Sequence, residues 1–364
     1  MDSRIPVHVL TGYLGAGKTT LLNRILSEDH GRRYAVIVNE FGEIGIDGDL
    51  VLKADEELFE MNNGCVCCTV RGDLIRTLHG LLRRSGNGDR PFDAIIVETT
   101  GLADPGPVAQ TFFVDPVLQA GTVLDSITTV VDAAHIQRRL DDSREAVEQI
   151  AFADQIVLNK TELASEAELA AIEARLRRIN PLAPIHRTQR ARVALDRLLG
   201  RGGFDLARIV LLEPQFLADA GAATPGHVHD AHCGHGPEHD DHGAIDPDHV
   251  HDDAISSISL TCSRPMDQAV FSQWLEALVA AQGQRILRLK GIIDIQGEGR
   301  RLVVQGVHML LEGELQREWL PGEPRSSRLV LIGRELDGGA LQAAFAGCAA
   351  GVPGVITEGF QIDT

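Results

Sequence analysis

The 364-residue sequence is poor in aromatic residues, in basic residues and in long apolar runs. Aromatic residues make up 4%, and 34 Lys and Arg stand against 52 Asp and Glu, which gives a formal net charge of -18. This charge repels phosphate backbones and anionic lipid headgroups, and no basic patch offsets it, so we expect neither nucleic acid nor a membrane as a partner. No apolar run approaches the roughly 18 residues of a membrane helix, and residues 1–10 lack a signal-peptide pattern. These absences predict a cytoplasmic protein.

Cysteine is scarce as well, with six in the chain, which argues against a disulfide framework. Three of the six nevertheless fall within four residues, at Cys65, Cys67 and Cys68. Because a reducing cytosol keeps them as thiols, metal or redox chemistry is the leading interpretation of this cluster.

The length exceeds what one hydrophobic core usually supports, so two domains are expected. In residues 1–211, short β-branched runs alternate with helical patterns, which is typical of an α/β fold with a mainly parallel sheet. The expected strands are 6–10, 35–39, 94–98, 127–131, 155–158 and 184–187, and the expected helices are 19–27, 73–84 and 165–179.

Periodicity is lost over residues 212–254, where His, Asp, Gly and Pro fill a stretch that cannot bury a core. We expect a flexible linker there. Residues 255–364 then predict a smaller α+β domain, of ferredoxin-like type. Its expected strands are 255–262, 286–295, 301–311 and 327–333, and its expected helices are 267–282 and 337–348.

Residues 12–19 satisfy the pattern G-x-x-x-x-G-K-[ST] between an apolar strand and a helical run. Glycines let backbone N–H groups surround a β-phosphate, Lys18 neutralises phosphate oxygens, and the Thr19 hydroxyl suits Mg²⁺. An accidental glycine turn is disfavoured, because a buried lysine needs an anion. The candidate nucleotide contacts of this loop are Gly12, Gly15, Ala16, Gly17, Lys18, Thr19 and Thr20.

A carboxylate ends the next apolar strand, at Glu98. We expect Glu98 to hold the Mg²⁺ shell or to orient the attacking water, and Gly101 to offer its N–H to the γ-phosphate. Lys18, Glu98 and Gly101 are therefore candidate catalytic residues. The alternative for Glu98 is a surface carboxylate that ends a strand.

The choice of base rests on Asn159, Lys160 and Glu162, which follow an apolar strand and resemble the guanine-reading N-K-x-D of GTPases. A carboxylate accepts hydrogen bonds from guanine N1 and N2, and Glu162 replaces the usual Asp. The sequence thus predicts GTP with Mg²⁺, the alternative being an ordinary helix-start turn.

The C-x-C-C spacing at Cys65, Cys67 and Cys68 offers at most three thiolates and leaves an open coordination position, unlike a closed structural zinc site. Thiolates favour Zn²⁺ or Cu⁺, while Co²⁺ and Ni²⁺ are also acceptable. Small buried hydrophobic residues and a redox thiol pair are the alternatives.

A second candidate metal-binding segment is rich in histidine and contains Cys233. Imidazoles at irregular spacing suit reversible binding of Zn²⁺, Ni²⁺ or Co²⁺, a reservoir for the thiol site, unless the segment is only a polar linker. Its histidines are His227, His229, His232, His235, His239, His242, His249 and His251. For the isolated His8, His79, His135 and His308 we expect ordinary structural roles.

The ordered set TGYLGAGKTT, VNEFGEIGIDG, NNGCVCCTV, ETTGLADP and NKTE, followed by an α+β domain, resembles the CobW family of metallochaperone GTPases. The resemblance implies a GTP-dependent carrier that delivers a metal, often zinc or cobalt, to a client enzyme docked on the C-terminal domain. It also implies that Glu43 is a switch residue or further metal ligand. Val38 departs from the family, since some relatives have Glu there. A monomer or a nucleotide-dependent homodimer fits the resemblance.

We therefore predict that GTP and Mg²⁺ fix residues 39–49 so that the thiolates converge on a metal, and that hydrolysis lowers the metal affinity. Two other functions stay open. One is a zinc store or sensor whose affinity is set by nucleotide, without client delivery. The other is an ATP-using kinase or synthetase, for which no acceptor site is evident.

Overall fold

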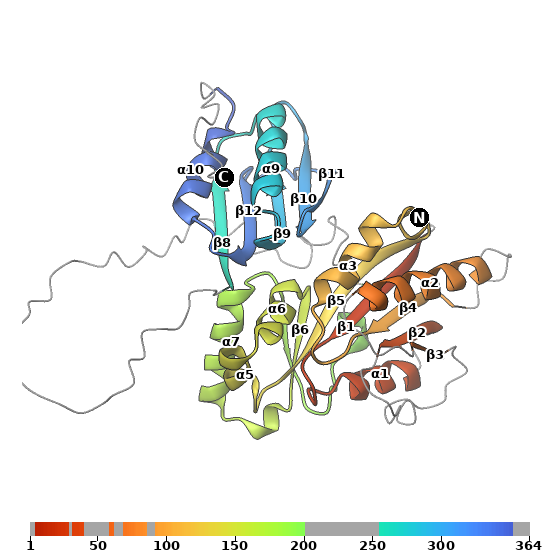
Figure 1. The fold of residues 1–364 in the computed structure, drawn as a ribbon. Coiled ribbons are helices and arrows are strands. Elements are labelled where there is room, and N and C mark those ends of the chain that lie inside the picture. Colours follow the sequence, from red (N-terminus) through yellow and green to blue (C-terminus); the bar gives the residue numbers. More distant parts are fainter. Residues whose placement is uncertain are drawn as a thin grey trace, which may run out of the picture.

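A computed structural model describes residues 4–28, 31–39, 58–61, 68–85, 92–200 and 255–351, which form two sheets with their helices (Figure 1). Within these ranges, no helix combines the length and the apolar content that crossing a membrane requires. Several predicted features lie outside the described residues: Cys65 and Cys67, Glu43, most of the segment 39–49 and the whole histidine-rich stretch.

The first sheet has seven strands in the order β3-β2-β4-β1-β5-β6-β7, and every neighbouring pair is parallel. The predicted α/β class is confirmed. Its strands are β1 (Ile5–Thr11), β2 (Tyr34–Asn39), β3 (Leu58–Met61), β4 (Ala94–Glu98), β5 (Thr122–Asp132), β6 (Gln155–Asn159) and β7 (Ile185–Arg187). The helices are α1 (Lys18–Ser27), α2 (Cys68–Ser85), α3 (Pro105–Val114), α4 (Pro116–Gly121), α5 (Ile136–Asp142), α6 (Arg144–Phe152) and α7 (Glu166–Ile179).

The central strands are buried and mainly apolar because helices cover both faces of the sheet. All five residues of β4 and all five of β6 are buried. Helix starts are fixed by side-chain caps: Asp104 and Asp115 begin α3 and α4, and Ser165 forms a capping box with Glu168 at α7. The sequence patterns did not reveal β3 or the four helices α3 to α6.

The second sheet is antiparallel, with strand order β11-β10-β9-β12-β8, and confirms the predicted α+β class. Helices α9 (Gln268–Gln282) and α10 (Gly338–Gly347) pack on one face (Figure 1). The strands are β8 (Ile255–Cys262), β9 (Ile286–Ile293), β10 (Arg300–Val307), β11 (Leu310–Glu318) and β12 (Ser327–Arg334).

Two expectations for this domain need correction. The order of elements differs from the ferredoxin-like βαββαβ, because α10 follows the last strand instead of preceding it. The strand predicted over residues 301–311 is a hairpin, since the chain turns at His308, whose φ of 52° is left-handed.

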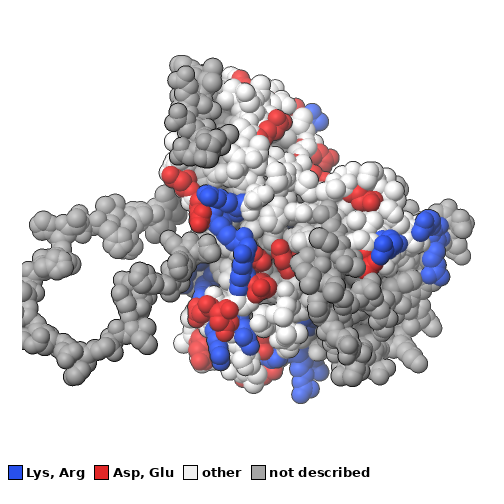
Figure 2. Space-filling model, viewed as in Figure 1, with Lys and Arg blue, Asp and Glu red and all other residues white. Residues whose placement is uncertain are grey.

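The two sheets are joined by a buried ionic contact. Asp154, directly after α6, accepts hydrogen bonds from Arg288 Nη2 at 2.6 Å and Lys290 Nζ at 2.7 Å on β9. The three side chains are 3%, 1% and 9% exposed, respectively. The second Asp154 oxygen accepts the Ile127 N–H of β5 at 2.9 Å. This carboxylate therefore connects the second, antiparallel sheet to the first one. On the surface, the charged side chains of the described residues are mixed in sign (Figure 2).

Replacing Asp154 by Ala should lower the free energy of unfolding by about 3–5 kcal/mol, because two cations stay buried without their carboxylate. Urea unfolding followed by circular dichroism measures this change. The matched control is Asp141→Ala, which removes a partner of Arg175 at a carboxylate that is 67% exposed, and should cost less than about 1 kcal/mol. Equal effects of the two substitutions would contradict the assignment.

Candidate functional site

The loop between β1 and α1 has the geometry of a phosphate cradle. Gly12 and Gly17 have φ angles of 140° and 108°, and a Cβ at Gly12 would lie 2.2 Å from the Val130 carbonyl oxygen. Lys18 is buried and donates from Nζ to the Gly12 carbonyl at 2.9 Å, so its charge is directed into the loop. The ten-residue helix α1 starts at Lys18 and adds its N-terminal dipole. The loop can thus surround a phosphate group.

Two predicted catalytic residues lie at the edge of this loop. In the register of the sheet, Leu10 at the end of β1 pairs with Glu98 at the end of β4. Glu98 is buried and accepts a hydrogen bond from Thr19 Oγ1 at 3.3 Å. The loop after β4 passes so close that a Cβ at Gly101 would lie 2.6 Å from the Leu14 backbone nitrogen. A hydroxyl and a carboxylate, both hard oxygen donors, are ligands that suit Mg²⁺.

Asn159 at the end of β6 links the base motif to the phosphate loop. Its Nδ2 donates to the Ala16 carbonyl at 2.9 Å, and its Oδ1 accepts the Ala191 N–H at 2.8 Å. Arg190 and Ala191 have consecutive left-handed φ angles of 48° and 54°. Such strain persists only where surrounding contacts hold it, which makes the turn after β7 part of the site. No motif or periodicity had indicated this turn.

Asp132 at the end of β5 is a site residue that the sequence analysis missed, although it ends an apolar strand as Glu98 does. Lys160 donates from Nζ to Asp132 Oδ2 at 2.7 Å, and His135 Nδ1 lies 3.0 Å from the same oxygen. Burial alone would raise the pKa of Asp132, but the bonds from Lys160, His135 and the Ala134 N–H outweigh it and lower the pKa.

A lowered folded-state pKa fixes the sign of the pH dependence. The stabilisation from the Asp132–Lys160 pair is fully present above the unfolded pKa, about 3.9, and is lost as the pH falls through the lower folded value. The ion pair with Asp132 therefore holds Lys160 in place throughout the neutral pH range. Glu162 is exposed in the short turn Thr161–Leu163 that follows, where its carboxylate is accessible to a ligand.

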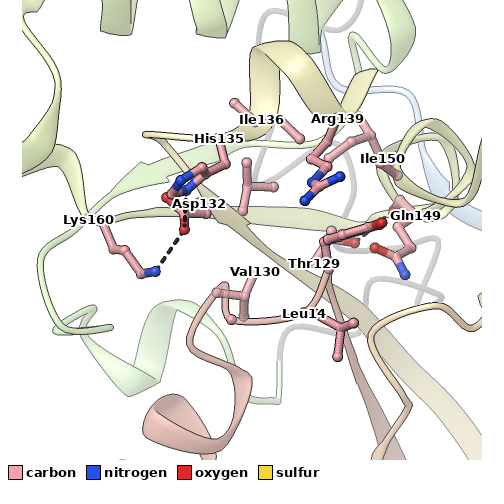
Figure 3. A pocket seen from close by; sticks show the side chains of 14 residues that line it. Leu14, Thr129, Val130, Asp132, His135, Ile136, Arg139, Gln149, Ile150 and Lys160 are labelled. Carbon is pink, nitrogen blue, oxygen red and sulfur yellow. Dashed lines mark hydrogen bonds and ion pairs between the residues drawn. The ribbon is translucent and has the colours of Figure 1, made fainter. Parts of the chain in front are cut away.

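A cavity of about 240 Å³ lies between the phosphate loop and helices α5 and α6 (Figure 3). Leu14 borders it on one side and the Asp132–Lys160 pair on the other. The guanidinium of Arg139 stands 4.8 Å from the centre of the Tyr13 ring. His135, for which only a structural role was expected, also lines this cavity. The space is thus continuous with the candidate nucleotide site.

The described residues on either side of the thiol motif belong to β3 and α2. Helix α2 begins at Cys68, and Met61 ends β3 in register with Asn39 of β2. On its other side β2 pairs Val38 with Glu98, so the ends of β3, β2, β4 and β1 meet at one edge of the sheet. Within the described residues, no group of three or more His, Cys, Asp or Glu side chains has the arrangement of a metal site.

Residues 6–187 match the family described as CobW/HypB/UreG, nucleotide-binding domain, and residues 255–349 match the cobalamin synthesis protein cobW C-terminal domain. The chain belongs to the CobW family. The zinc chaperone YjiA of Escherichia coli is 36% identical, over 94% of this chain and 98% of its own length. The zinc chaperone CobW of Pseudomonas aeruginosa is 37% identical, over 93% of this chain and 90% of its own.

A solved structure described as Zn(II)-bound YjiA GTPase from E. coli has the same fold, with a TM-score of 0.68 and 34% identity. The similarity covers 95% of this chain and 99% of that one, and therefore includes both domains. The resemblance to the CobW family in the sequence motifs is confirmed.

The substitution Gly12→Ala should lower kcat/KM for nucleotide hydrolysis about 100-fold, because the new Cβ forces the loop away from β5. Steady-state phosphate release measures the effect. The matched control is Gly80→Ala in α2, where a Cβ has no neighbour within 4 Å; it should leave hydrolysis unchanged and stabilise the helix by about 0.5–1 kcal/mol. Hydrolysis by the Gly12→Ala protein at the original rate would contradict the interpretation of this loop as the phosphate-binding loop.

Proposed function

We propose that this protein is a GTP-hydrolysing metallochaperone that binds zinc at Cys65, Cys67 and Cys68 and delivers it to a client protein. The observation that carries the proposal is the shared sheet edge. Glu98 and Met61 lie on strands separated only by β2, roughly 10 Å apart at the usual strand spacing. The chain between Met61 and Cys68 carries the other two thiols, so the nucleotide and the metal bind to neighbouring segments.

Each residue of the nucleotide site has a chemical task. Lys18 and the backbone N–H groups of residues 12–17 bind the phosphates, and Gly101 offers its N–H to the γ-phosphate. Thr19 would hold Mg²⁺, which supplies charge neutralisation when bound, and Glu98 would orient its shell or the attacking water. Asn159 positions the loop, while Lys160 and Glu162 face the base.

For the thiol cluster the relatives' names favour zinc as the metal, since they are called zinc chaperones. Three thiolates suit zinc and leave one position open for transfer, and Co²⁺ or Ni²⁺ are the other metals that such a site accepts. The buried Cys348 does not compete, because burial raises the pKa of its thiol to about 11 and keeps it protonated. Glu43 is a further ligand in this proposal, and the eight histidines form the reservoir.

The domain assignment follows from this function. Residues 1–211 form the GTPase domain, 212–254 the histidine-rich linker and 255–364 the C-terminal domain on which the client docks. The cytoplasm supplies both GTP and reduced thiols. The second candidate is a store or sensor, favoured by the concentration of histidines in one stretch, which needs no client.

Guanine selectivity should depend on the carboxylate of Glu162. Glu162→Ala removes a charged acceptor and should weaken GTP binding about 10- to 100-fold while leaving ATP binding unchanged. Competition of GTP and ATP against a fluorescent GDP analogue on nucleotide-free protein measures both. The control is Glu166→Ala, an exposed carboxylate four residues away that pairs with Arg187. Preference of the unaltered protein for ATP would instead favour the kinase or synthetase.

Metal release should follow the nucleotide state. With Mg²⁺ and a non-hydrolysable GTP analogue, zinc affinity from anaerobic chelator competition should be at least about tenfold tighter than with GDP, equivalent to about 1.4 kcal/mol. Protein lacking residues 226–253 removes the histidine contribution. Conversion of Cys65, Cys67 and Cys68 to Ser should abolish the tight binding. Tight binding that is equal in both nucleotide states would shift the assignment to the store or sensor.

A further inference from the structure

Helix α6 reaches into the loop after β4 through one amide side chain. Gln149 is 1% exposed, and its Nε2 donates to the carbonyl oxygens of Gly101 and Ala103, both at 3.1 Å. The backbone carbonyl of Gln149 accepts a hydrogen bond from Thr129 Oγ1 on β5 at 2.8 Å. The loop that borders the phosphate cradle is therefore held by α6, and α6 is held by the sheet.

The neighbouring residue on α6 faces the other domain. Glu148 is buried and accepts hydrogen bonds from Arg144 Nε at 2.9 Å and from Arg334 at the end of β12. Just beyond the end of α6, Asp154 binds Arg288 and Lys290 of β9. Two successive residues of one helix thus contact the loop after β4 and the C-terminal domain.

A third contact joins α6 to the C-terminal domain. His308, in the left-handed turn between β10 and β11, places its ring 5.2 Å from the ring of Phe152 at the end of α6. A Cβ on Gly106 would lie 2.9 Å from His308 Nε2 and 3.0 Å from Phe152 Cζ. The hairpin of the C-terminal domain therefore packs against the first turn of α3, the helix that the loop after β4 enters.

The charges at the junction act on the same loop. Asp104 caps α3 by accepting the Gly106 N–H at 2.8 Å. Burial raises the pKa of the Asp104 carboxyl, and the charge of Glu148 raises it further, while the Gly106 N–H, Arg334 and Arg144 oppose the shift. A group on β12 of the second domain is thus within electrostatic range of the loop.

Resting on the proposed GTPase function, we infer that Gln149 and Glu148 of α6 couple the loop at Gly101 to the C-terminal domain, so that the nucleotide state changes the packing of the His308 hairpin. Gln149 is a positioning residue: it acts through the carbonyls of Gly101 and Ala103. Displacement of that loop removes the donor from the buried Gly101 carbonyl and the part-buried Ala103 carbonyl unless α6 follows. Because α6 is fixed to β9 and β12, its movement carries the second sheet with it.

The test is hydrogen exchange of residues 303–313 in the full-length protein, with Mg²⁺ and either GDP or a non-hydrolysable GTP analogue. Exchange rates in the hairpin should differ at least about fivefold between the two nucleotides. Emission of Trp274 and Trp319, the protein's two tryptophans, should differ as well, since both lie in the C-terminal domain.

Two substitutions test the coupling, one in the second domain and one beside the loop after β4. Arg334→Gln should abolish the nucleotide-dependent difference and leave GTP affinity within about twofold, because Arg334 lies on β12 in the second domain. Gln149→Leu should abolish the difference and also lower kcat about tenfold with KM within about twofold, as expected for lost positioning of Gly101. Gln296→Leu, an exposed glutamine in the second domain, is the matched control and should change neither quantity.

The outcomes are distinguishable. If guanine nucleotides bind and the hairpin shows no difference, or if the difference persists in both variants, the coupling is absent while the GTPase assignment stands. If guanine nucleotides do not bind the unaltered protein, the proposed function fails and the coupling with it. A difference present in the unaltered and Gln296→Leu proteins and lost in the other two establishes the coupling.

Discussion

The candidate site depends on the buried amide of Asn159. One side chain bonds the carbonyl of Ala16 in the phosphate loop and the N–H of Ala191 in the turn after β7. Both partners are buried backbone groups, so loss of the amide would leave one donor and one acceptor unsatisfied at about 1–3 kcal/mol each. A Cβ on Gly17 would also lie 2.5 Å from the Asn159 Nδ2, which shows how closely the loop packs on it. The phosphate loop and the base motif of the candidate site are therefore held together by this one side chain.

The second domain is attached to the first by helix α6 and not by a broad apolar surface alone. Arg288 and Lys290 on the otherwise apolar β9 would be costly to bury without Asp154. Buried ionic contacts of this kind need accurate geometry, and so they favour one arrangement of the domains over others of similar apolar area. If the second domain is to respond to the nucleotide state, the two domains must keep one fixed arrangement.

Much of the fold follows from local patterns. The strand Ala94–Glu98 has its predicted bounds because its apolar run and its terminal carboxylate are both visible in the sequence. Helix α3 was missed because its two early prolines resemble a break, although proline is tolerated in a first turn that Asp104 caps. The hairpin after β10 was merged into one strand because His308 takes a left-handed φ without glycine or asparagine.

The candidate site likewise contains residues that could be predicted from local patterns and residues that could not. The phosphate loop, Glu98 and the base motif are contiguous motifs, and they could be predicted. The pairings of Asp132 and Gln149 could not, even though Asp132 ends an apolar strand, since each partner is brought near by the sheet: Lys160 lies 28 residues from Asp132, and Gly101 lies 48 residues from Gln149. Such roles depend on strand order, and strand order is a property of the whole domain.

The proposed function places two metals near one sheet edge, and ligand chemistry explains how the two could be kept apart. Thr19 and Glu98 present only oxygen donors, which suit Mg²⁺ with its preference for hard ligands and retained water. The cysteines present sulfur, which Mg²⁺ does not bind and zinc does. In the proposed function, selectivity comes from the donor type at each segment, so the metal that accompanies the nucleotide need not displace the metal that is carried. Under the proposed function, a change at the nucleotide would reach the metal as movement of the chain and not as an exchange of ions.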